Sequence, residues 1–180
     1  MKFEKISFEQ FEKDFKKFLE TQDYGFKITE DMIHVWYNNI TIPRKIAGSA
    51  GYTFLTPYPF KVHVYRNIFV PTGLKAILDD DKVLFLHPSS LTKNYFQLNE
   101  NDIISSDYKP DSEGHILICM RKRSKTVSVV NGKFELIADM GSVMIKANEK
   151  IAQGIIIPSY SMEDDNKYNP TLSEVWDKTF

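Results

Sequence analysis

Asn99 to Ile116 reads NENDIISSDYKPDSEGHI, and the rest of the sequence is organised around this stretch. Its pair Ile103–Ile104 is β-branched and favours an extended backbone. The segment Lys109–Ser112 contains the proline, aspartate and serine typical of turns, and an apolar strand pattern resumes at His115. The pattern predicts a β-hairpin.

The composition is that of one globular domain with appendages. Of the 180 residues, 42% are hydrophobic and 13% aromatic. The chain is long enough for one domain with a hydrophobic core and too short for two such domains. The net charge of −1 gives no general attraction to nucleic acid or membranes, so an anionic ligand must be held by a local site. No apolar stretch approaches the roughly 18 residues of a membrane span. We expect a cytoplasmic protein in which Cys119 is a buried, reduced thiol and which contacts neither nucleic acid nor a membrane.

The N-terminal part predicts a helix followed by two short strands. Ser7–Leu19 has phenylalanines on one face and charges on the other, and Ser7 and Gln10 form a predicted capping box. The apolar face must be covered, so we expect the helix to dock on the β domain or on a neighbouring subunit. Met32–Tyr37 and Ile40–Ile42 are predicted strands around an Asn38–Asn39 turn.

After Pro43 the sequence becomes a series of short apolar runs separated by glycine, proline, asparagine and aspartate. This spacing predicts an all-β sandwich or barrel, and Asn131–Gly132 predicts a hairpin within it. We expect an N-terminal amphipathic helix over 1–24, a β domain over 25–160 and a C-terminal tail over 161–180. The predicted strands are Tyr52–Leu55, Val62–Phe69, Leu74–Leu78, Val83–Leu86, Ile116–Met120, Thr126–Val130, Phe134–Ile137, Val143–Lys146 and Ile151–Ile157.

Four further blocks stand in order around the 99–116 stretch: SAGYTF at 49–54, VPTGL at 70–74, HPSSLTKN at 87–94 and NEKIAQGIIIP at 148–158. Together they resemble the trimeric dUTPase family, whose blocks read AGYD, VPTG, one with an Arg-Ser-Ser core, roughly GVIDSDY, and GDRIAQ. The SEGHI after the DY pair is like phage and Gram-positive members. The resemblance covers residues 43–160. It implies an all-β, dUTPase-like barrel of the β-clip or jelly-roll type, here with an added N-terminal helix, that assembles as a homotrimer.

The family hydrolyses dUTP to dUMP and pyrophosphate, so the resemblance implies a deoxyuridine nucleotide as ligand. It places Asn99 at the uracil edge and Tyr108 under the deoxyribose. Ser89 and Ser90 match the family's phosphate-lining pair, and Gln153 matches a glutamine that contacts phosphate across a subunit boundary. Mg²⁺ is expected to arrive on the nucleotide phosphates, and no metal ligand is predicted in the chain itself.

The sequence departs from the family where the chemistry is done. The family's catalytic aspartate falls on Ser105, whose hydroxyl can hold a water but cannot take its proton near pH 7. The arginine before the serine pair is Pro88, and the acid of the first block is Thr53. The family's glycine-rich C-terminal arm has no counterpart after Gln153. These changes predict a degenerate site on an intact scaffold.

Three functions therefore stay open. The first is a nucleotide-binding protein with weakened or lost catalysis, which can also serve as a partner-binding regulator. The second is an active dUTP diphosphatase or related nucleotide hydrolase with a substitute carboxylate, either Asp107 or Glu113, or a residue of another subunit. Asp107 shares the strand face of Ser105 but lies about 6.6 Å further along the chain. The third is a non-enzymatic regulatory or assembly protein of a phage or mobile element, acting through a protein partner.

Overall fold

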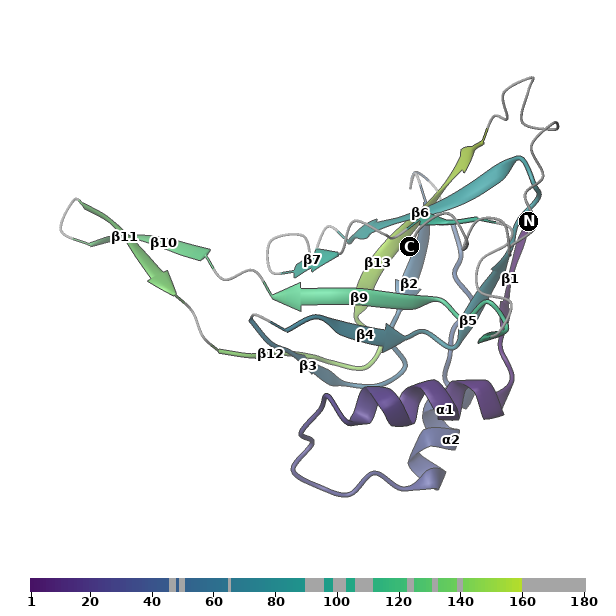
Figure 1. The fold of residues 1–180 in the computed structure, drawn as a ribbon, viewed down its shortest axis with the longest axis horizontal. Coiled ribbons are helices and arrows are strands. Elements are labelled where there is room, and N and C mark those ends of the chain that lie inside the picture. Colours follow the sequence, from purple (N-terminus) through teal and green to yellow (C-terminus); the bar gives the residue numbers. More distant parts are fainter. Residues whose placement is uncertain are drawn as a thin grey trace, which may run out of the picture.

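The computed structural model describes residues 1–45, 48, 51–64, 66–89, 96–98, 103–105, 112–122, 125–130, 133–138 and 141–159. Figure 1 shows a mostly β structure with two helices beneath the strands. The helices are α1 (Phe8–Leu19) and α2 (Glu30–Asn38). The strands are β1 (Lys2–Lys5), β2 (Tyr52–Leu55), β3 (Phe60–Val62), β4 (Ile68–Pro71), β5 (Leu74–Ile77), β6 (Lys82–Pro88), β7 (Phe96–Leu98), β8 (Ile103–Ile104), β9 (Leu117–Lys122), β10 (Lys125–Val130), β11 (Lys133–Ala138), β12 (Val143–Ile145) and β13 (Lys150–Pro158).

The strands form separate small sheets. Within the described residues, the largest has the order β2-β13-β6-β8 and the next β4-β9-β7. Three two-stranded sheets pair β1 with β5, β3 with β12, and β10 with β11. The β10–β11 pair extends away from the other strands (Figure 1). The all-β prediction is confirmed, although these sheets do not close into one hydrogen-bonded barrel.

The predicted N-terminal helix is confirmed. Ser7 is its N-cap, and the Ser7 Oγ accepts a hydrogen bond from the Gln10 backbone N–H at 3.2 Å. The reciprocal bond of the predicted capping box comes from elsewhere in the chain. The Ser7 N–H donates to Glu113, while the Gln10 side-chain amide donates to Asp14.

The two strands predicted around Asn38–Asn39 are wrong, because Glu30–Asn38 is helix α2. Thr29 caps α2 through an Oγ1 that accepts from the Met32 N–H, and acidic residues occupy the first turn. Ile33 and Trp36 then recur at a helical spacing and pack into the core. The spacing of three residues between these two core residues indicates a helix, whereas a strand would show apolar residues at every second position.

Two further strand predictions differ from the structure. The predicted Val62–Phe69 strand is split, since β3 ends at Val62 and β4 begins at Ile68. Among the described residues, β8 pairs with β6 whereas β9 pairs with β4 and β7, so the predicted hairpin over 99–116 is not seen between β8 and β9. Hairpin turns hold roughly two to five residues, and the 105–116 connection is longer. The hairpin predicted at Asn131–Gly132 is confirmed by the antiparallel β10–β11 register, although residues 131–132 themselves lie outside the described part.

Helix α1 contributes directly to the hydrophobic core. Phe11 and Phe15 are fully buried, and the Phe15 ring meets Tyr58 edge-on at a centroid distance of 4.7 Å. These residues belong to one buried cluster that also contains the strand residues Phe54 and Ile118. The helix is therefore part of the packed domain. The domain boundaries at residues 24 and 160 stay predictions, and residues 161–180 lie outside the described part.

The predicted buried thiol is confirmed, because Cys119 is a free cysteine that is 4% exposed. Neither described helix is long and apolar enough to span a membrane.

Replacing Phe15 with alanine tests whether α1 is a structural part of the core. The substitution removes a fully buried aromatic ring, so we expect a loss of about 3–5 kcal/mol in the free energy of unfolding. Phe26→Ala is the matched control, because Phe26 is 58% exposed, and it should cost less than about 1 kcal/mol. Urea unfolding followed by circular dichroism measures both. Equal losses in the two variants would contradict a core role for α1.

Candidate functional site

Three of the seven site residues predicted from the sequence lie in the described part of the chain. They are Ser89, Ser105 and Gln153. The remaining four fall outside the described residues and stay predictions: Ser90, Asn99, Asp107 and Tyr108.

Gln153 lies in the central strand β13 of the largest sheet. Its Cα is opposite Thr53 of β2 on one side and His87 of β6 on the other. Residues directly opposite in antiparallel strands carry their side chains on the same face, so these three residues form a polar row. Their chain neighbours Phe54 and Ala152 are fully buried, which puts the polar row on the outer face of the sheet. All three polar-row residues are half-buried.

Ser89 lies just beyond the end of β6 and is 4% exposed. Its Oγ donates a hydrogen bond to the Lys150 carbonyl oxygen at 3.1 Å, where β13 begins. Pro88, the residue before it, pairs with Ala152. The ends of β6 and β13 thus bring Ser89 next to the polar row, and the serine hydroxyl has a fixed orientation.

Gly51, in the SAGYTF block, explains why this block needs a glycine. A Cβ placed on Gly51 would collide with the Gly154 carbonyl oxygen and lie 3.1 Å from the Gln153 Cγ. The chain entering β2 therefore passes directly over β13 beside the polar row. Only a residue without a side chain allows this approach.

Ser105 lies further along the same sheet. It follows β8, whose Ile104 pairs with Leu84, three positions along β6 from His87. At a strand rise of about 3.3 Å per residue, this offset amounts to about 10 Å. Within one chain, the described residues therefore bring Ser89 and Gln153 together and leave Ser105 apart from them.

Glu113 lies at the start of helix α1. Its Oε2 accepts from the Ser7 backbone N–H at 2.9 Å, and its Oε1 accepts from the Ser7 Oγ at 2.5 Å. The Glu113 carboxylate is therefore bonded to the N-cap of α1, where a negative charge is favoured by the helix dipole. Glu113 has φ 56°, an uncommon conformation for a residue other than glycine, and Gly114 follows with φ 72°.

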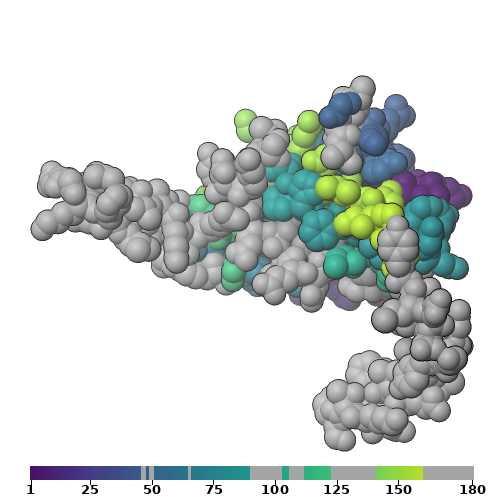
Figure 2. All heavy atoms as spheres, turned by 90° about the horizontal axis from the view of Figure 1, so that it is seen from above, coloured from purple at the N-terminus to yellow at the C-terminus, as the bar shows by residue number. Residues whose placement is uncertain are grey.

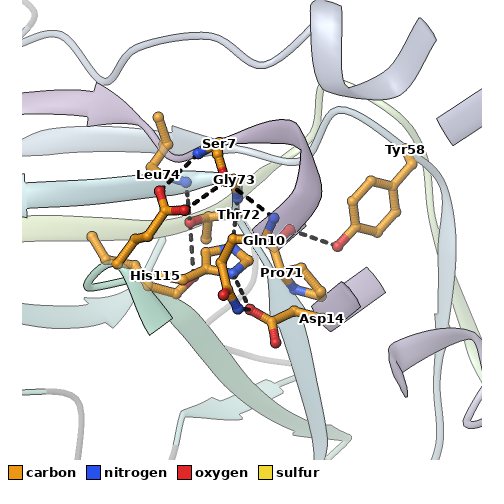
Figure 3. Close-up of polar contacts among 11 residues, drawn as sticks. Ser7, Gln10, Asp14, Tyr58, Pro71, Thr72, Gly73, Leu74 and His115 are labelled. Atoms are coloured by element: carbon orange, nitrogen blue, oxygen red, sulfur yellow. Dashed lines mark hydrogen bonds and ion pairs between the residues drawn. The ribbon is translucent and has the colours of Figure 1, made fainter. Parts of the chain in front are cut away.

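His115 is completely buried and bridges α1 to the turn between β4 and β5. Its Nε2 accepts from the Gly73 N–H at 2.9 Å, and its Nδ1 lies 2.7 Å from the Asp14 Oδ2 (Figure 3). A backbone N–H can only donate, so Nε2 carries the lone pair and Nδ1 carries the proton donated to Asp14. The hydrogen bonds therefore fix one neutral tautomer of the imidazole.

The Thr72–Leu74 turn completes this connection. The Thr72 Oγ1 donates to the Ile116 carbonyl oxygen at 2.7 Å, and the Ile116 N–H donates to the Leu74 carbonyl oxygen at 2.8 Å. Gly73 adopts φ 71°, and its carbonyl oxygen accepts from the Ile6 N–H at 3.1 Å. The VPTGL and SEGHI blocks therefore contact each other through hydrogen bonds that these residue types can make.

Two carboxylates of this network have lowered pKa values. Burial acts to raise the pKa of Asp14, but the hydrogen bonds from His115 and Gln10 outweigh it and the pKa falls below its ordinary value. For Glu113, the hydrogen bonds from the Ser7 side chain and backbone lower the pKa. Both groups are therefore stabilised as carboxylates in the folded protein.

Sequence reasoning missed the role of Asp14, because its partner lies 101 positions away in the chain. The phenylalanine stripe of α1 predicts which face is buried but not which polar side chain accepts the histidine proton. The sequence did point to Glu113, as a candidate substitute carboxylate. The structure shows that this carboxylate contacts Ser7.

Comparison with known proteins agrees with the fold. No family profile matches the chain. The deoxyuridine 5'-triphosphate nucleotidohydrolase of Lactococcus lactis subsp. lactis (strain IL1403) is 27% identical over 132 residues, covering 70% of this chain and 78% of the relative. The dUTPase of Streptococcus mutans superposes with a TM-score of 0.53 at 25% identity, covering 79% of this chain and 96% of that one.

A phage protein gives a similar structural match. It is a variant of the dUTPase from phage phi11 of Staphylococcus aureus, solved to describe the coordination of a structural Mg(II) ion. Its TM-score is 0.53 at 18% identity, with 77% of this chain and 94% of that chain covered. The class defined by fold and site is thus a mostly β protein with the dUTPase fold. Within that class, the chain is similar to the dUTPases of Lactococcus lactis and Streptococcus mutans.

The lowered pKa of Asp14 predicts acid sensitivity. A carboxylate with a lowered folded-state pKa stabilises the fold above its ordinary pKa of about 3.9, and this contribution disappears as the pH falls through the folded-state value. We expect urea unfolding of wild type and Asp14→Asn to give a constant free-energy difference between pH 7 and pH 5 that shrinks below about pH 4. Glu113 titrates in both proteins, so its contribution cancels.

Asp80→Asn is the control for this experiment, because Asp80 is exposed. It should show no such pH-dependent difference from wild type. A difference between wild type and Asp14→Asn that is as large at pH 3 as at pH 7 would show that the charge of Asp14 does not stabilise the fold.

Proposed function

We propose that this chain binds a deoxyuridine nucleotide and that its hydrolysis of dUTP to dUMP and pyrophosphate is weakened or lost. The observation that carries the proposal is Ser105, a hydroxyl at the position where the resemblance places the family's catalytic aspartate. A positioned general base typically contributes about 10²–10⁴ in rate, and a serine cannot supply it. The related Lactococcus protein is a deoxyuridine 5'-triphosphate nucleotidohydrolase, which supports the choice of nucleotide.

The polar row supports phosphate binding. Gln153 carries an amide group with two donors, on the outer face of the sheet and beside the oriented hydroxyl of Ser89. In the described part of the chain, no three His, Cys, Asp or Glu side chains are grouped so that they could hold a metal ion. In our proposal Mg²⁺ is carried by the phosphates of the nucleotide, because phosphate oxygens are ligands that it prefers.

The contacts of Glu113 bear on the alternative of an active enzyme with a substitute base. Both carboxylate oxygens accept hydrogen bonds from Ser7, and these bonds lower the pKa of Glu113. A carboxylate held in this way is a weaker base and is oriented toward the helix. This supports a missing base rather than a replaced one and leaves Asp107, or a residue of another subunit, as the competing candidate.

Next to the polar row, the outer face of the same sheet becomes apolar. Ile155 of β13, Phe85 of β6 and Ile103 of β8 are Cα partners in one row across the sheet. Ile103 is 55% exposed, Phe85 37% and the neighbouring Ile157 42%. Figure 2 shows β13 in yellow-green beside β6 in teal on this surface. We call the residues Phe85, Ile103, Ile155 and Ile157 the apolar patch.

Exposed apolar surface of this kind typically marks a protein contact. We propose that the apolar patch is the subunit contact of a homotrimer. A neighbouring subunit seated there would border the polar row, because Gln153 and Ile155 share one face of β13. This arrangement supports a nucleotide site completed by a second subunit.

The first experiment measures pyrophosphate release from dUTP and Mg²⁺, with the other deoxynucleoside triphosphates in parallel and binding of a non-hydrolysable dUTP analogue by calorimetry. We expect binding with little or no turnover for the wild type. Ser105→Asp restores a carboxylate and should raise turnover by up to about 10²–10⁴ if that group alone is missing. Ser105→Asn is the matched control, because it has the size of aspartate but cannot act as a base.

The other outcomes separate the alternatives. Fast dUTP turnover by the wild type that Asp107→Asn abolishes would establish an active enzyme with a substitute base. No nucleotide binding by a stably folded oligomer would leave the regulatory or assembly protein. Analogue binding without any gain from Ser105→Asp would show that Pro88, Thr53 and the missing arm share the loss of activity with Ser105.

The homotrimer is tested by light scattering after gel filtration. We expect the wild type to have about three times the 20.9 kDa chain mass. Ile103→Glu places a charge in the apolar patch and should shift the protein to the monomer mass, because burying an unpaired carboxylate is costly. Phe69→Glu is the control, since Phe69 of β4 has the same 55% exposure but lies on another sheet. A monomeric wild type would overturn the proposed assembly.

A further inference from the structure

The segment Ser112–Ile116, called here the anchor segment, is held from two sides. On one side, α1 contacts it through Ser7–Glu113 and Asp14–His115. On the other side, the Thr72–Leu74 turn bonds to the His115 ring and to both backbone polar groups of Ile116. Figure 3 shows His115 between Asp14 on one side and Gly73 on the other.

The backbone of the anchor segment is in a conformation that its contacts must maintain. Glu113 has φ 56° and Gly114 φ 72°, and the His115 N–H donates to the Ser112 carbonyl oxygen at 2.9 Å. A left-handed conformation in a residue that is not glycine persists only where surrounding contacts determine it. Here the two hydrogen bonds from Ser7 hold the Glu113 side chain, so helix α1 maintains the turn.

The Asp14–His115 contact fixes the anchor segment more rigidly than packing alone. The imidazole is fully buried, and each of its nitrogens has one partner of the required type. Turning the ring over would place carbon atoms against the Gly73 N–H and the Asp14 carboxylate, leaving buried polar groups unpaired. Helix α1, the anchor segment and the Thr72–Leu74 turn therefore have a single relative position.

The anchor segment is close in the chain to the residues predicted to hold the nucleotide. Only residues 106–111 separate it from Ser105, and Tyr108 is among them. At the other end, β8 pairs with β6 immediately before Ser105. The stretch that contains Tyr108, the predicted sugar platform, thus follows the paired strand β8 and ends at the anchor segment. Helix α1 contacts the anchor segment.

We propose that helix α1 is a positioning element for nucleotide binding, with Asp14 and Glu113 as the positioning residues that act through the anchor segment. This inference rests on the proposed function, because it assumes that the stretch between Ser105 and the anchor segment contacts a deoxyuridine nucleotide. It assigns to the added N-terminal helix a role beyond covering the core. Neither Asp14 nor Glu113 is required to touch the ligand.

The test compares Asp14→Ala, Asp14→Asn and Glu12→Ala in the full-length protein. Dissociation constants for the non-hydrolysable dUTP analogue are measured by calorimetry at a temperature at which circular dichroism shows every variant folded. We expect Asp14→Ala to raise the dissociation constant about tenfold. Asp14→Asn keeps an oxygen that can accept the His115 Nδ1 proton and should stay within about twofold of wild type. Glu12→Ala removes an ion pair with the exposed Lys16 on the same helix and should leave the dissociation constant unchanged.

A second readout does not depend on the ligand. Amide hydrogen exchange of peptides covering 103–116 should be faster in Asp14→Ala than in wild type, and peptides covering β13 should exchange equally. If Asp14→Ala does not fold, the milder Glu113→Gln variant at the exposed end of the network replaces it. It retains an acceptor but loses the charge, so we expect changes of the same direction and smaller size.

The outcomes are distinguishable. If the wild type binds no deoxyuridine nucleotide, the proposed function fails, and the positioning proposal fails with it as a statement about nucleotide binding. If the wild type binds and Asp14→Ala lowers only the melting temperature, with unchanged dissociation constant and exchange rates over 103–116, then α1 is merely structural and the proposal is overturned. Weaker binding in Asp14→Ala that Asp14→Asn restores, together with faster exchange confined to 103–116, supports positioning.

Discussion

The structure depends on one buried imidazole, that of His115, which donates to Asp14 and accepts from the Gly73 N–H. This ring joins three segments that are distant in the sequence: helix α1, the turn after β4 and the chain leading into β9. Each of its nitrogens requires a partner of one type, so the contact determines orientation as well as proximity. The phenylalanines of α1 pack into the apolar core and supply most of the burial. Apolar packing alone does not define the position of the helix along its axis or its rotation about that axis.

The same network explains why blocks that look like nucleotide motifs persist beside a changed site. Gly73 must adopt φ 71° and must donate its N–H, and Gly51 must leave room for the Gly154 carbonyl. These requirements come from the fold and hold whether or not a nucleotide is hydrolysed. The presence of VPTGL, SEGHI and the first-block glycine is therefore a statement about architecture, and activity has to be judged from other positions.

The sequence predicted what depends on local pattern and missed what depends on distant partners. The Ser7 cap and the apolar stripe of α1 were readable because cap and stripe recur within one or two turns. Helix α2 was misread as strands because its apolar residues are crowded over positions 32–37, which obscures the helical spacing of the core residues Ile33 and Trp36. The Ser7–Glu113 bonds span 106 positions, and no periodicity encodes such a contact. The candidate site was reached only through block order, since Gln153 and Ser89 are brought together by strand register.

The residues that hold the fold around His115 differ from the positions at which the family places its acidic groups, Ser105 and Thr53. Ser105 follows a two-residue strand, whereas the two ring nitrogens of His115 are paired with Asp14 and the Gly73 N–H. A substitution at either position therefore removes neither partner of the His115 ring, and a buried group left without its partner is a usual reason why a polar substitution destabilises a protein. Loss of His115 or Gly73 would leave such partners. A scaffold built in this way can change at the positions that the family uses for chemistry while the contacts of His115 still hold helix α1, the Thr72–Leu74 turn and the chain leading into β9 together.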